Sequence, residues 1–453
     1  MKKNLIIFGL GPHAQACQYR FLENLYKAGV SIKILLLAEL QDKQANIEAF
    51  FEDRELIPEQ IIGLPSEDRN SDTINPKLLS VLESIKKQVD GVLICTEPKA
   101  HKKYILWALQ NNIDVLTDKP LTACDINQKG PEQLWQDYLD IEKALASSKA
   151  RVTLLTNKRI HPAYKAVYDI TKEFVCEYKV PITQIEISEG GGVWNFPCEF
   201  AVKENHPYKY GYGILLHTGF HYVDLLLHYQ SINHLIGFKE DALNIHAFGT
   251  TPFDVLHQIS KANYEKLFPG EDFTEEFKQI PWDDYKKYGI VDALVSLQFL
   301  KEGAVITQSN LNMLQNTLSA RDFRPTPKNP YLGSGRLTQN YISIFCGPLF
   351  HIHLNFFQPD LLPEDEVDNY IVEVYRNTQL IGGESYEKIE FQDSLFVEGE
   401  GNISLNYVAK RNILENWLED SCSTNDFALH KRAVKLTVDI FEEIFKRRKE
   451  RFG

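Results

Sequence analysis

The spacing of apolar and polar positions changes near residue 155, and it predicts two kinds of architecture. Before that point, short continuous apolar runs alternate with longer segments of helical periodicity. Continuous apolar strands separated by helices are typical of a parallel sheet that is covered on both faces. We expect strands at residues 5–8, 32–37, 91–96, 113–116 and 151–155, and helices at residues 14–27 and 99–110.

The second half of the chain has a different pattern. Residues 182–189 (I-T-Q-I-E-I-S-E) and 293–300 (A-L-V-S-L-Q-F-L) alternate apolar and polar positions, which predicts antiparallel strands with one wet face. Residues 270–288 and 321–336 are rich in Pro, Gly and charged residues, and we expect long loops or insertions there. Residues 428–452 have the pattern of an amphipathic helix.

Length, charge and cysteine content narrow the class of protein. A chain of 453 residues is too long for one ordinary core, so we expect two domains. A net charge of -13 disfavours nonspecific binding to nucleic acids or anionic membranes, and no apolar run is long enough to span a bilayer. The seven cysteines are scattered and include no C-x-x-C pair. We therefore expect reduced thiols in a cytoplasmic protein, with neither a disulfide framework nor a structural zinc site.

The first strand runs directly into a glycine motif that precedes a helix. Such a G-x-G-x-x-A motif lets the backbone turn tightly and approach a pyrophosphate, while the small last residue allows close packing of helix on strand. Glu39 follows the second strand, where a carboxylate accepts hydrogen bonds from both ribose hydroxyls and repels a 2′-phosphate. We therefore expect a dinucleotide site that favours NAD over NADP. The alternative is that Glu39 only caps the following helix. The motif consists of Gly9, Leu10, Gly11, Pro12, His13 and Ala14.

Three further motifs follow in order: T-E-P-K-A-H at residues 96–101, D-K-P at 118–120, and G-I-L-L-H-T-G-F-H-Y-V-D at 213–224. Together with the glycine motif, this order resembles the glucose–fructose oxidoreductase, inositol dehydrogenase and rhizopine-catabolism (Gfo/Idh/MocA) family. The resemblance is good over about residues 1–230 and weaker afterwards. It implies an α/β protein with an N-terminal Rossmann domain (1–155), followed by an α+β domain with a large, open, mostly antiparallel sheet (156–453). Insertions are expected near residues 232–291 and 321–400.

The resemblance also implies an activity, namely hydride transfer between NAD(P) and a secondary hydroxyl or ketone of a sugar, nucleotide-sugar or cyclitol. It implies a homodimer or homotetramer. N-K-R-I-H-P at residues 157–162 looks like the family's R-R-x-x-P segment, so Lys158 and Arg159 are expected to line the substrate pocket. From the T-E-P-K-A-H and D-K-P motifs, the resemblance implies further residues at the cofactor: Thr96, Glu97, Pro98, His101, Asp118 and Lys119.

Lys119 is the expected acid/base of this chemistry. Oxidising a secondary alcohol requires a base for the hydroxyl proton, and the reverse reaction requires the same group to return it. A lysine normally titrates near ~10.4, so burial and the positive nicotinamide ring must lower its pKa for it to serve. The alternative is a surface lysine beside a proline turn.

The two histidines at residues 217 and 221 leave several interpretations open. His221 matches the family's catalytic histidine, and His217 stands where the family has an aspartate. On a regular helix the two would stack on one face, as a metal pair or as a polar face would. A metal would need a third ligand, because His228 lies too far along the helix; His351 and His353 are the candidates. We favour His221 as acid/base with His217 beside it, and expect no metal. Replacing an anion by a neutral imidazole makes Lys119 easier to deprotonate.

The substrate is expected to meet an aromatic and polar segment at residues 190–212. Aromatic rings stack on the C–H faces of a sugar, while amines and hydroxyls bind its oxygens. Arg321, Arg324 and Lys328 offer an anion site for a charged sugar. Two other functions stay open: a metabolite sensor that keeps the fold without turnover, and a glycoside-cleaving enzyme with tightly held NAD. The candidate substrate contacts in and beside the segment are Trp194, Tyr208, Lys209, Thr218 and His221.

Overall fold

The protein consists of two compact units in a computed structural model. The structure describes residues 2–204, 207–319, 337–357, 369–397, 401–419, 421 and 425–453. The first unit contains residues 1–124, 132–161 and 395–434, and the second contains residues 125–131, 162–394 and 435–453. The domain division at residue 155 stays a prediction. The compact first unit also takes in a late segment of the chain.

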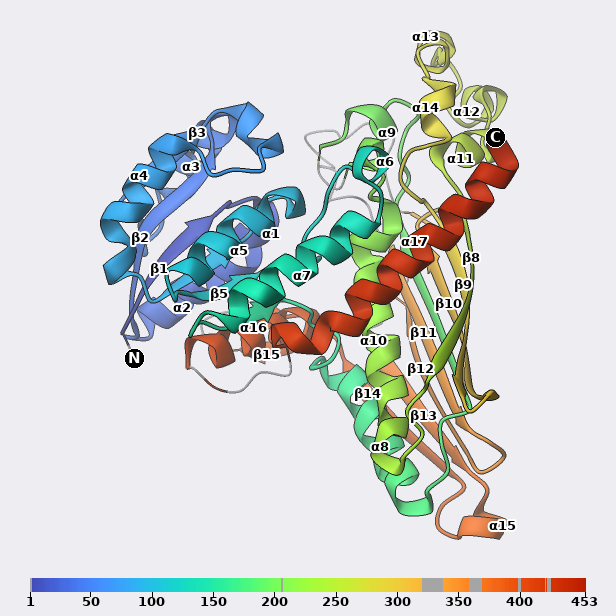
Figure 1. Ribbon diagram of the computed structural model, residues 1–453. Helices are drawn as coiled ribbons and strands as arrows, with labels where there is room; N and C mark the ends of the chain where they lie inside the picture. The colour runs from blue at the N-terminus through green and yellow to red at the C-terminus, as the bar shows by residue number, and fades with distance from the viewer. Residues whose placement is uncertain are drawn as a thin grey trace. The chain divides into compact units, whose positions relative to one another are not determined.

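The first unit is built on a six-stranded parallel sheet with the strand order β3-β2-β1-β4-β5-β6 (Figure 1). The order reverses direction at β1, as in dinucleotide-binding folds, where ligands bind beyond the carboxyl ends of the strands. The five predicted strands are confirmed. The additional strand, β3, has only four residues with alternating burial, too short a pattern to be recognised. The strands are β1 (Lys2–Phe8), β2 (Ser31–Leu40), β3 (Ile61–Leu64), β4 (Gly91–Ile94), β5 (Asp114–Thr117) and β6 (Val152–Leu154).

Helices cover this sheet. The helix expected at residues 14–27 is present, but it is interrupted by a π-helical turn at Gln15–Tyr19. The helix expected at residues 99–110 is confirmed as α5, preceded by a 3-10 turn at Pro98–Ala100. The helices of this unit are α1 (Pro12–Ala14), α2 (Arg20–Lys27), α3 (Gln44–Phe51), α4 (Pro76–Ile85), α5 (His101–Gln110), α7 (Glu132–Ala146) and α16 (Leu405–Leu418); β15 (Leu395–Val397) and β16 (Gly401–Ile403) form a separate pair.

The late segment joins the first unit through α16. Ile413, Leu414 and Trp417 of this helix are buried in the same apolar cluster as Leu5 and Leu93 of the sheet. Trp417 lies over Gly91, where an added Cβ would come within 2.7 Å of the indole ring. Burial of these side chains is the main force that holds α16 in place.

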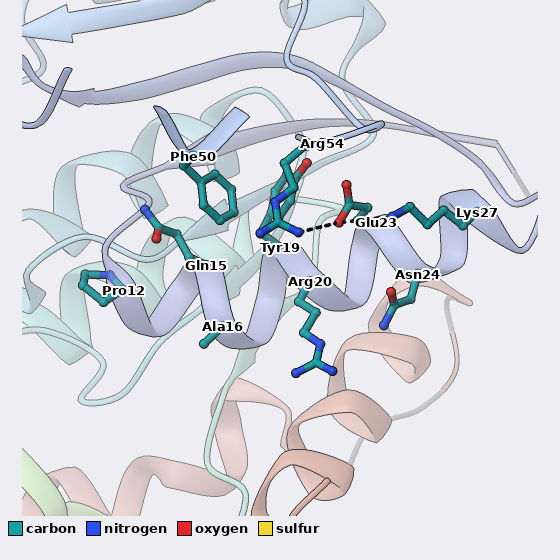
Figure 2. A pocket seen from close by; sticks show the side chains of 10 residues that line it. All are labelled: Pro12, Gln15, Ala16, Tyr19, Arg20, Glu23, Asn24, Lys27, Phe50 and Arg54. Atoms are coloured by element: carbon teal, nitrogen blue, oxygen red, sulfur yellow. Dashed lines mark hydrogen bonds and ion pairs between the residues drawn. The ribbon is translucent and has the colours of Figure 1, made fainter. Parts of the chain in front are cut away.

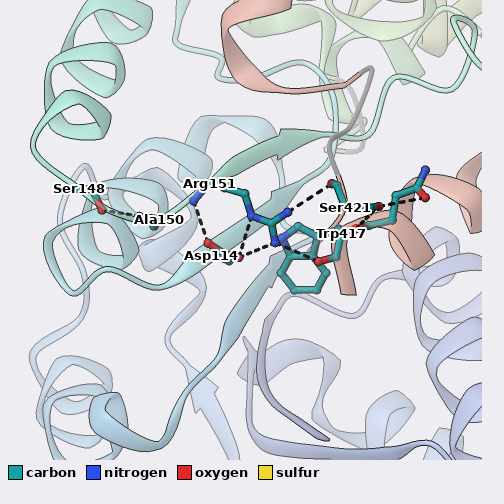
Figure 3. A network of polar contacts seen from close by, with 7 residues as sticks. Asp114, Ser148, Ala150, Arg151, Trp417 and Ser421 are labelled. Carbon is teal, nitrogen blue, oxygen red and sulfur yellow. Dashed lines mark hydrogen bonds and ion pairs between the residues drawn. The ribbon is translucent and has the colours of Figure 1, made fainter. Parts of the chain in front are cut away.

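A polar network secures the end of α16 (Figure 3). The Arg151 guanidinium forms an ion pair with Asp114 at 2.7 Å. It also donates to the carbonyl oxygens of Trp417 at 3.2 Å and Ser421 at 3.4 Å. One side chain thus ties the strand at residue 114 to residues more than 260 positions away in the chain.

The second unit is built on an eight-stranded sheet with the order β14-β13-β12-β11-β7-β10-β9-β8. All neighbouring strands are antiparallel except β7 and β10, so the expected mostly antiparallel sheet is confirmed. Four strands of this sheet lie within residues 321–400, one of the two ranges where an insertion was expected. The strands are β7 (Gln184–Gly192), β8 (Ala242–Gly249), β9 (Ala293–Lys301), β10 (Ala304–Leu314), β11 (Leu337–Cys346), β12 (Phe350–Phe357), β13 (Asn369–Arg376) and β14 (Tyr386–Gln392).

Two long helices of this unit run along one face of its sheet (Figure 1). α8 packs on β12 and β13, and α10 packs on β7 and β10. The alternating burial of β9 and β12 agrees with the prediction that the sheet face away from these helices is exposed to solvent. The helices are α6 (Ile126–Lys129), α8 (Pro162–Tyr178), α9 (Glu199–Val202), α10 (Phe220–Gln230), α11 (Pro252–Gln258), α12 (Lys261–Leu267), α13 (Thr274–Lys278), α14 (Trp282–Tyr285), α15 (Thr378–Ile381) and α17 (Lys431–Phe452), which confirms the expected C-terminal helix.

The prediction of a long loop at residues 270–288 was wrong. The segment forms the short helices α13 and α14, because its aromatic side chains are buried. Phe273 packs with Tyr264 of α12, and Tyr285 packs with Phe200 of α9. The other expected loop, residues 321–336 with Arg321, Arg324 and Lys328, lies outside the described residues.

Candidate functional site

The glycine motif has the geometry of a dinucleotide-binding loop. Gly9 has φ +80°, and a Cβ there would lie 2.9 Å from the Cα and N of Thr96. Gly11 has φ -66° and ψ 171°, which any residue adopts, and no heavy atom lies within 4 Å of where its Cβ would stand. Neither strain nor packing within the protein therefore calls for glycine at Gly11. The open space next to its backbone fits a pyrophosphate. Ala14 is buried, as close packing of the helix requires.

Glu39 lies at the end of β2, next to this loop. Its Oε2 accepts a hydrogen bond from the Leu10 N–H at 2.7 Å, and its Oε1 accepts one from the Leu40 N–H at 2.8 Å. The carboxylate is thereby held between the glycine loop and the second strand. This is the place at which the sequence predicted a ribose contact.

His13 extends from the motif toward α16. Its Nε2 lies 3.1 Å from Nζ of Lys410. The positive charge of Lys410, together with burial, lowers the pKa of His13 to about 4, so the imidazole is neutral at physiological pH. Sequence reasoning missed Lys410, because nothing in the helical pattern of residues 405–418 marks this lysine.

A groove of about 610 Å³ runs along the outer side of the motif helix (Figure 2). Glu23 lies in it with its side chain nearly buried, 3.5 Å from Arg54 and 3.7 Å from Lys27. Arg54 and Lys27 thus face an anion within the groove. None of the predicted catalytic residues lines this groove, so we assign it no chemistry.

His101 joins the two loops that follow β4 and β5. Its ring is fully buried, with Nε2 2.9 Å from the Thr96 carbonyl oxygen and Nδ1 3.2 Å from Thr117 Oγ1. Burial lowers the pKa of His101 and keeps the ring neutral. Nδ1 also lies 3.2 Å from the Leu121 carbonyl oxygen, so a neutral ring, with one N–H, donates to only one of the two carbonyl oxygens. His101 thus contacts the loop at Thr96, and its contact with the cofactor stays a prediction.

The D-K-P turn follows β5. The Asp118 N–H donates to the Ile94 carbonyl oxygen at 3.0 Å, which attaches the turn to β4. Asp118 Oδ1 in turn accepts from the Lys119 N–H at 2.8 Å. Lys119 is half-buried, and the Lys119–Pro120 peptide bond is cis. Pro98 of the preceding loop is buried, and its carbonyl oxygen accepts from the Ala123 N–H at 3.2 Å. Glu97, just before Pro98, has extended backbone.

Lys158 and Arg159 are buried within the first unit. Lys158 Nζ donates to Asn406 Oδ1 at 3.3 Å, and Asn157 Nδ2 donates to the same oxygen at 3.0 Å. The Arg159 guanidinium donates to the Leu429 carbonyl oxygen at 3.0 Å. The late segment thus supplies partners to both predicted substrate residues, and their contact with substrate stays a prediction.

In the second unit, the histidine segment is not the regular helix that the sequence predicted. Residues Leu215–Gly219 form a π-helical turn, and α10 begins at Phe220. The α-helical spacing of His217 and His221 therefore does not apply. π-helical turns are frequent at functional sites. The described residues include one directly after the glycine motif, at Gln15–Tyr19, and one in the histidine segment.

The histidines of this segment have different surroundings. His217 and Thr218 are half-buried, whereas His221 is 8% exposed and Asp224 is 1% exposed. His228 stacks on Tyr168 with ring centroids 4.1 Å apart and planes 3° apart, so it belongs to the packing of α10 against α8.

Gln315 is a partner of His217 that sequence reasoning missed. Its Nε2 lies 3.0 Å from His217 Nδ1. Gln315 follows β10 in an ordinary strand sequence, L-N-M-L-Q, so no local signal marks it. Tyr208, a predicted substrate contact, donates its hydroxyl to Gln315 Oε1.

The other predicted substrate contacts lie on the loops around this pair. Lys209 Nζ forms an ion pair with Glu204 at 2.5 Å. Trp194 donates its indole N–H to the Tyr264 hydroxyl at 3.0 Å and packs among Phe196 and Phe268. The residues around Tyr264 thus position the Trp194 ring.

Two features of the described residues bear on ligands and membranes. Nowhere in the described ranges do three or more His, Cys, Asp and Glu side chains gather as a metal site would require. His351 and His353 lie on β12, where they contact Ser343 at 2.7 Å and Glu373 at 2.8 Å. No helix in the described parts of the chain is long and apolar enough to cross a membrane. The six cysteines whose structure is described are free thiols.

Together, the open glycine loop, Glu39 and the strand order define a protein with a Rossmann dinucleotide-binding unit. Residues 39–135 match the NAD-binding Rossmann fold of the GFO_IDH_MocA oxidoreductase family. The resemblance inferred from the motif order is thereby confirmed. Over these residues the chain is similar to the NAD-binding oxidoreductases of this family. No curated protein matches the sequence.

Solved structures with the same fold extend over both units. An oxidoreductase from Agrobacterium radiobacter, in complex with NAD+, L-tartaric acid and magnesium, is 13% identical with a TM-score of 0.56, covering 99% of this chain and 97% of that chain. A 3-ketoreductase from Actinomadura kijaniata, in complex with NADP, is 12% identical with a TM-score of 0.54, covering 98% of each chain. A myo-inositol dehydrogenase from Corynebacterium glutamicum is 11% identical with a TM-score of 0.52, covering 99% and 98%. At these identities the likeness concerns the fold.

Proposed function

We propose that the protein transfers hydride between the nicotinamide of NAD and a secondary hydroxyl or ketone of a sugar, nucleotide-sugar or cyclitol. The observation that carries the cofactor half of the proposal is the open space beside Gly11, a glycine that the protein's own packing does not require. The proposed substrate class is supported by solved structures of similar fold, which include a myo-inositol dehydrogenase and a 3-ketoreductase.

Glu39 supports NAD over NADP. A ribose with free 2′- and 3′-hydroxyls donates to a carboxylate, whereas a 2′-phosphate would be repelled by it. Two backbone N–H groups donate hydrogen bonds to Glu39 and hold this carboxylate in place. The glycine loop and the ribose contact are thereby coupled through one side chain.

The bound cofactor supplies the hydride acceptor at nicotinamide C4, and side chains of this chain manage the proton. We assign Lys119 as the base that takes the hydroxyl proton as hydride leaves the carbon, and as the acid that returns it in the reverse direction. We assign His221 as a second acid/base that contacts the substrate hydroxyl. Its burial excludes bulk water from this proton.

A first experiment tests the cofactor and the substrate class separately. NADH binding is followed by fluorescence titration, and a panel of cyclitols, aldoses and nucleotide-sugars is then assayed for NADH formation. The proposal expects NAD to bind more tightly than NADP and at least one polyol to be oxidised. Binding without any turnover would favour the sensor, and NAD that co-purifies without accumulating as NADH would favour the glycoside-cleaving enzyme. Failure to bind either dinucleotide would overturn the proposal.

A second experiment tests His221. His221→Ala is expected to lose turnover while NADH binding persists. His228→Phe is the matched control on the same helix, because a phenyl ring keeps the stack on Tyr168 without a titratable nitrogen. Turnover in His221→Ala equal to that of the wild type would refute its role.

A further inference from the structure

A continuous chain of polar side chains in the second unit ends at His217. Lys203 Nζ donates to Asn195 Oδ1 at 3.2 Å, and Asn195 Nδ2 donates to the Tyr208 hydroxyl at 3.5 Å. Tyr208 donates to Gln315 Oε1, and Gln315 Nε2 donates to His217 Nδ1 at 3.0 Å. Asn195, Tyr208 and Gln315 are each 5% exposed or less, so water competes little for these bonds.

The direction of every bond in this chain follows from its first member. A lysine ammonium only donates, so the atom of Asn195 that faces Lys203 is the carbonyl oxygen. The amide nitrogen of Asn195 then faces Tyr208 and can only donate, which leaves the tyrosine proton for Gln315. The side-chain oxygen of Gln315 therefore accepts the tyrosine proton, and the side-chain N–H of Gln315 faces His217.

His217 therefore receives a hydrogen bond at Nδ1. A neutral imidazole that accepts at Nδ1 carries its proton on Nε2. A proton on Nδ1 would set two N–H groups against each other across 3.0 Å, so the contact favours the tautomer that carries its proton on Nε2.

The backbone around Gln315 holds this arrangement. The Gln315 N–H donates to Asp292 Oδ1 at 2.8 Å, and its carbonyl oxygen accepts from the Val193 N–H at 2.9 Å. Thr250 Oγ1 donates to the other Asp292 oxygen at 3.2 Å. The Gln315 backbone is thus held at both its N–H and its carbonyl oxygen, and the Tyr208 hydroxyl orients the side-chain amide.

We propose that Gln315, oriented by Tyr208, is a positioning residue that holds His217 as the neutral Nε2–H tautomer. The site then presents a hydrogen-bond donor at the position where the family resemblance leads one to expect an aspartate, which only accepts. The substrate oxygen that meets His217 is an acceptor, such as a carbonyl or carboxylate oxygen. The substrate part of this inference rests on the proposed function, whereas the tautomer does not.

The tautomer is measured directly by nitrogen-15 NMR of histidine-labelled protein, with the His217 signals assigned from a His217→Asn variant. The wild type is expected to show a protonated Nε2 and an unprotonated Nδ1. Gln315→Glu replaces the donor by an acceptor and is expected to move the proton to Nδ1. Asn316→Ala is the matched control: its side-chain bond goes to Gln258, outside the chain to His217, and the backbone contact to Asp292 is retained.

Two outcomes would overturn the inference: a wild-type His217 protonated at Nδ1, or a Gln315→Glu variant with the same tautomer as the wild type. Tyr208→Phe provides a second route if Gln315→Glu does not fold, because it removes the bond that orients Gln315 and is expected to yield a mixture of tautomers. A single wild-type tautomer in Tyr208→Phe would count against the relay.

A kinetic readout tests the substrate part. Gln315→Glu is expected to raise KM for the carbonyl substrate about tenfold, the scale of one lost hydrogen bond, while the NADH dissociation constant stays unchanged. An unchanged KM with a changed tautomer would refute the substrate contact alone. Absence of turnover in the wild type would refute the proposed function and leave the tautomer measurement valid.

Discussion

The two glycines of the phosphate loop are expected to respond in opposite ways to the same substitution. Gly9→Ala places a methyl group 2.9 Å from the backbone of Thr96, at a residue with φ +80°. Gly11→Ala places one in open space, at an extended residue. The first change therefore affects the stability of the protein, and the second affects only what the loop binds.

The magnitudes follow from these surroundings. For Gly9→Ala, the left-handed conformation costs ~1–2 kcal/mol and the contact with Thr96 a further ~1–3 kcal/mol, so the free energy of unfolding falls by roughly 2–5 kcal/mol. For Gly11→Ala, reduced freedom of the unfolded chain contributes ~0.4–1 kcal/mol, offset by the weaker capping preference of alanine. Its stability is expected within about 1 kcal/mol of the wild type, while NADH affinity falls at least about tenfold.

Urea unfolding and NADH fluorescence titration on the same preparations measure both quantities. A Gly11→Ala variant that binds NADH as tightly as the wild type would show that no pyrophosphate approaches this backbone. A Gly9→Ala variant as stable as the wild type would refute the close approach of Thr96. Gly29→Ala is a useful reference, because Gly29 has φ +88° but no neighbour within 4 Å, so it isolates the conformational cost.

Three further predictions concern charged side chains of the first unit. Lys410→Ala is expected to raise the pKa of His13 from about 4 toward its ordinary 6.5, measured by NMR titration; an unchanged pKa would exclude Lys410 as the cause. Because the folded pKa is the lower one, His13 contributes stability above pH 6.5 that is lost as the pH falls toward 4, and Lys410→Ala should reduce this loss in acid unfolding curves. Arg151→Ala removes the ion pair with Asp114 and the bonds to the end of α16, and thermal unfolding should show a loss of about 1–2 kcal/mol, smaller in Arg151→Lys. Glu39→Ala is expected to shift the ratio of NAD to NADP affinity toward NADP on the order of tenfold, and an unchanged ratio would contradict the ribose contact.

The local pattern of the chain was sufficient for most of the architecture. Five strands of the parallel sheet and the C-terminal helix follow from apolar spacing alone, because burial on a strand or helix repeats along the chain itself. The pattern failed at residues 270–288, where Pro, Gly and charges predicted a loop. There, the burial of Phe273 and Tyr285 by neighbours from other segments outweighed the local composition.

Some residues of the candidate site could be predicted from the sequence, and others could not. The glycine motif, Glu39, Lys119 and His221 are identifiable from the sequence because each stands in a motif of adjacent residues. Lys410 lies 397 positions from the histidine that it contacts, and Gln315 lies 98 positions from His217. No spacing pattern along the chain predicts contacts between residues so far apart in sequence.

By itself, the sequence predicted the class of the protein, the candidate cofactor loop and the residues assigned to the proposed chemistry. Only the tertiary structure decided the surroundings of those residues. It brings α16 onto the Rossmann sheet, sets Lys410 beside His13, and aims the Gln315 amide at His217. The physical reason is that protonation states and hydrogen-bond directions depend on neighbours in space, which the order of residues along the chain does not specify.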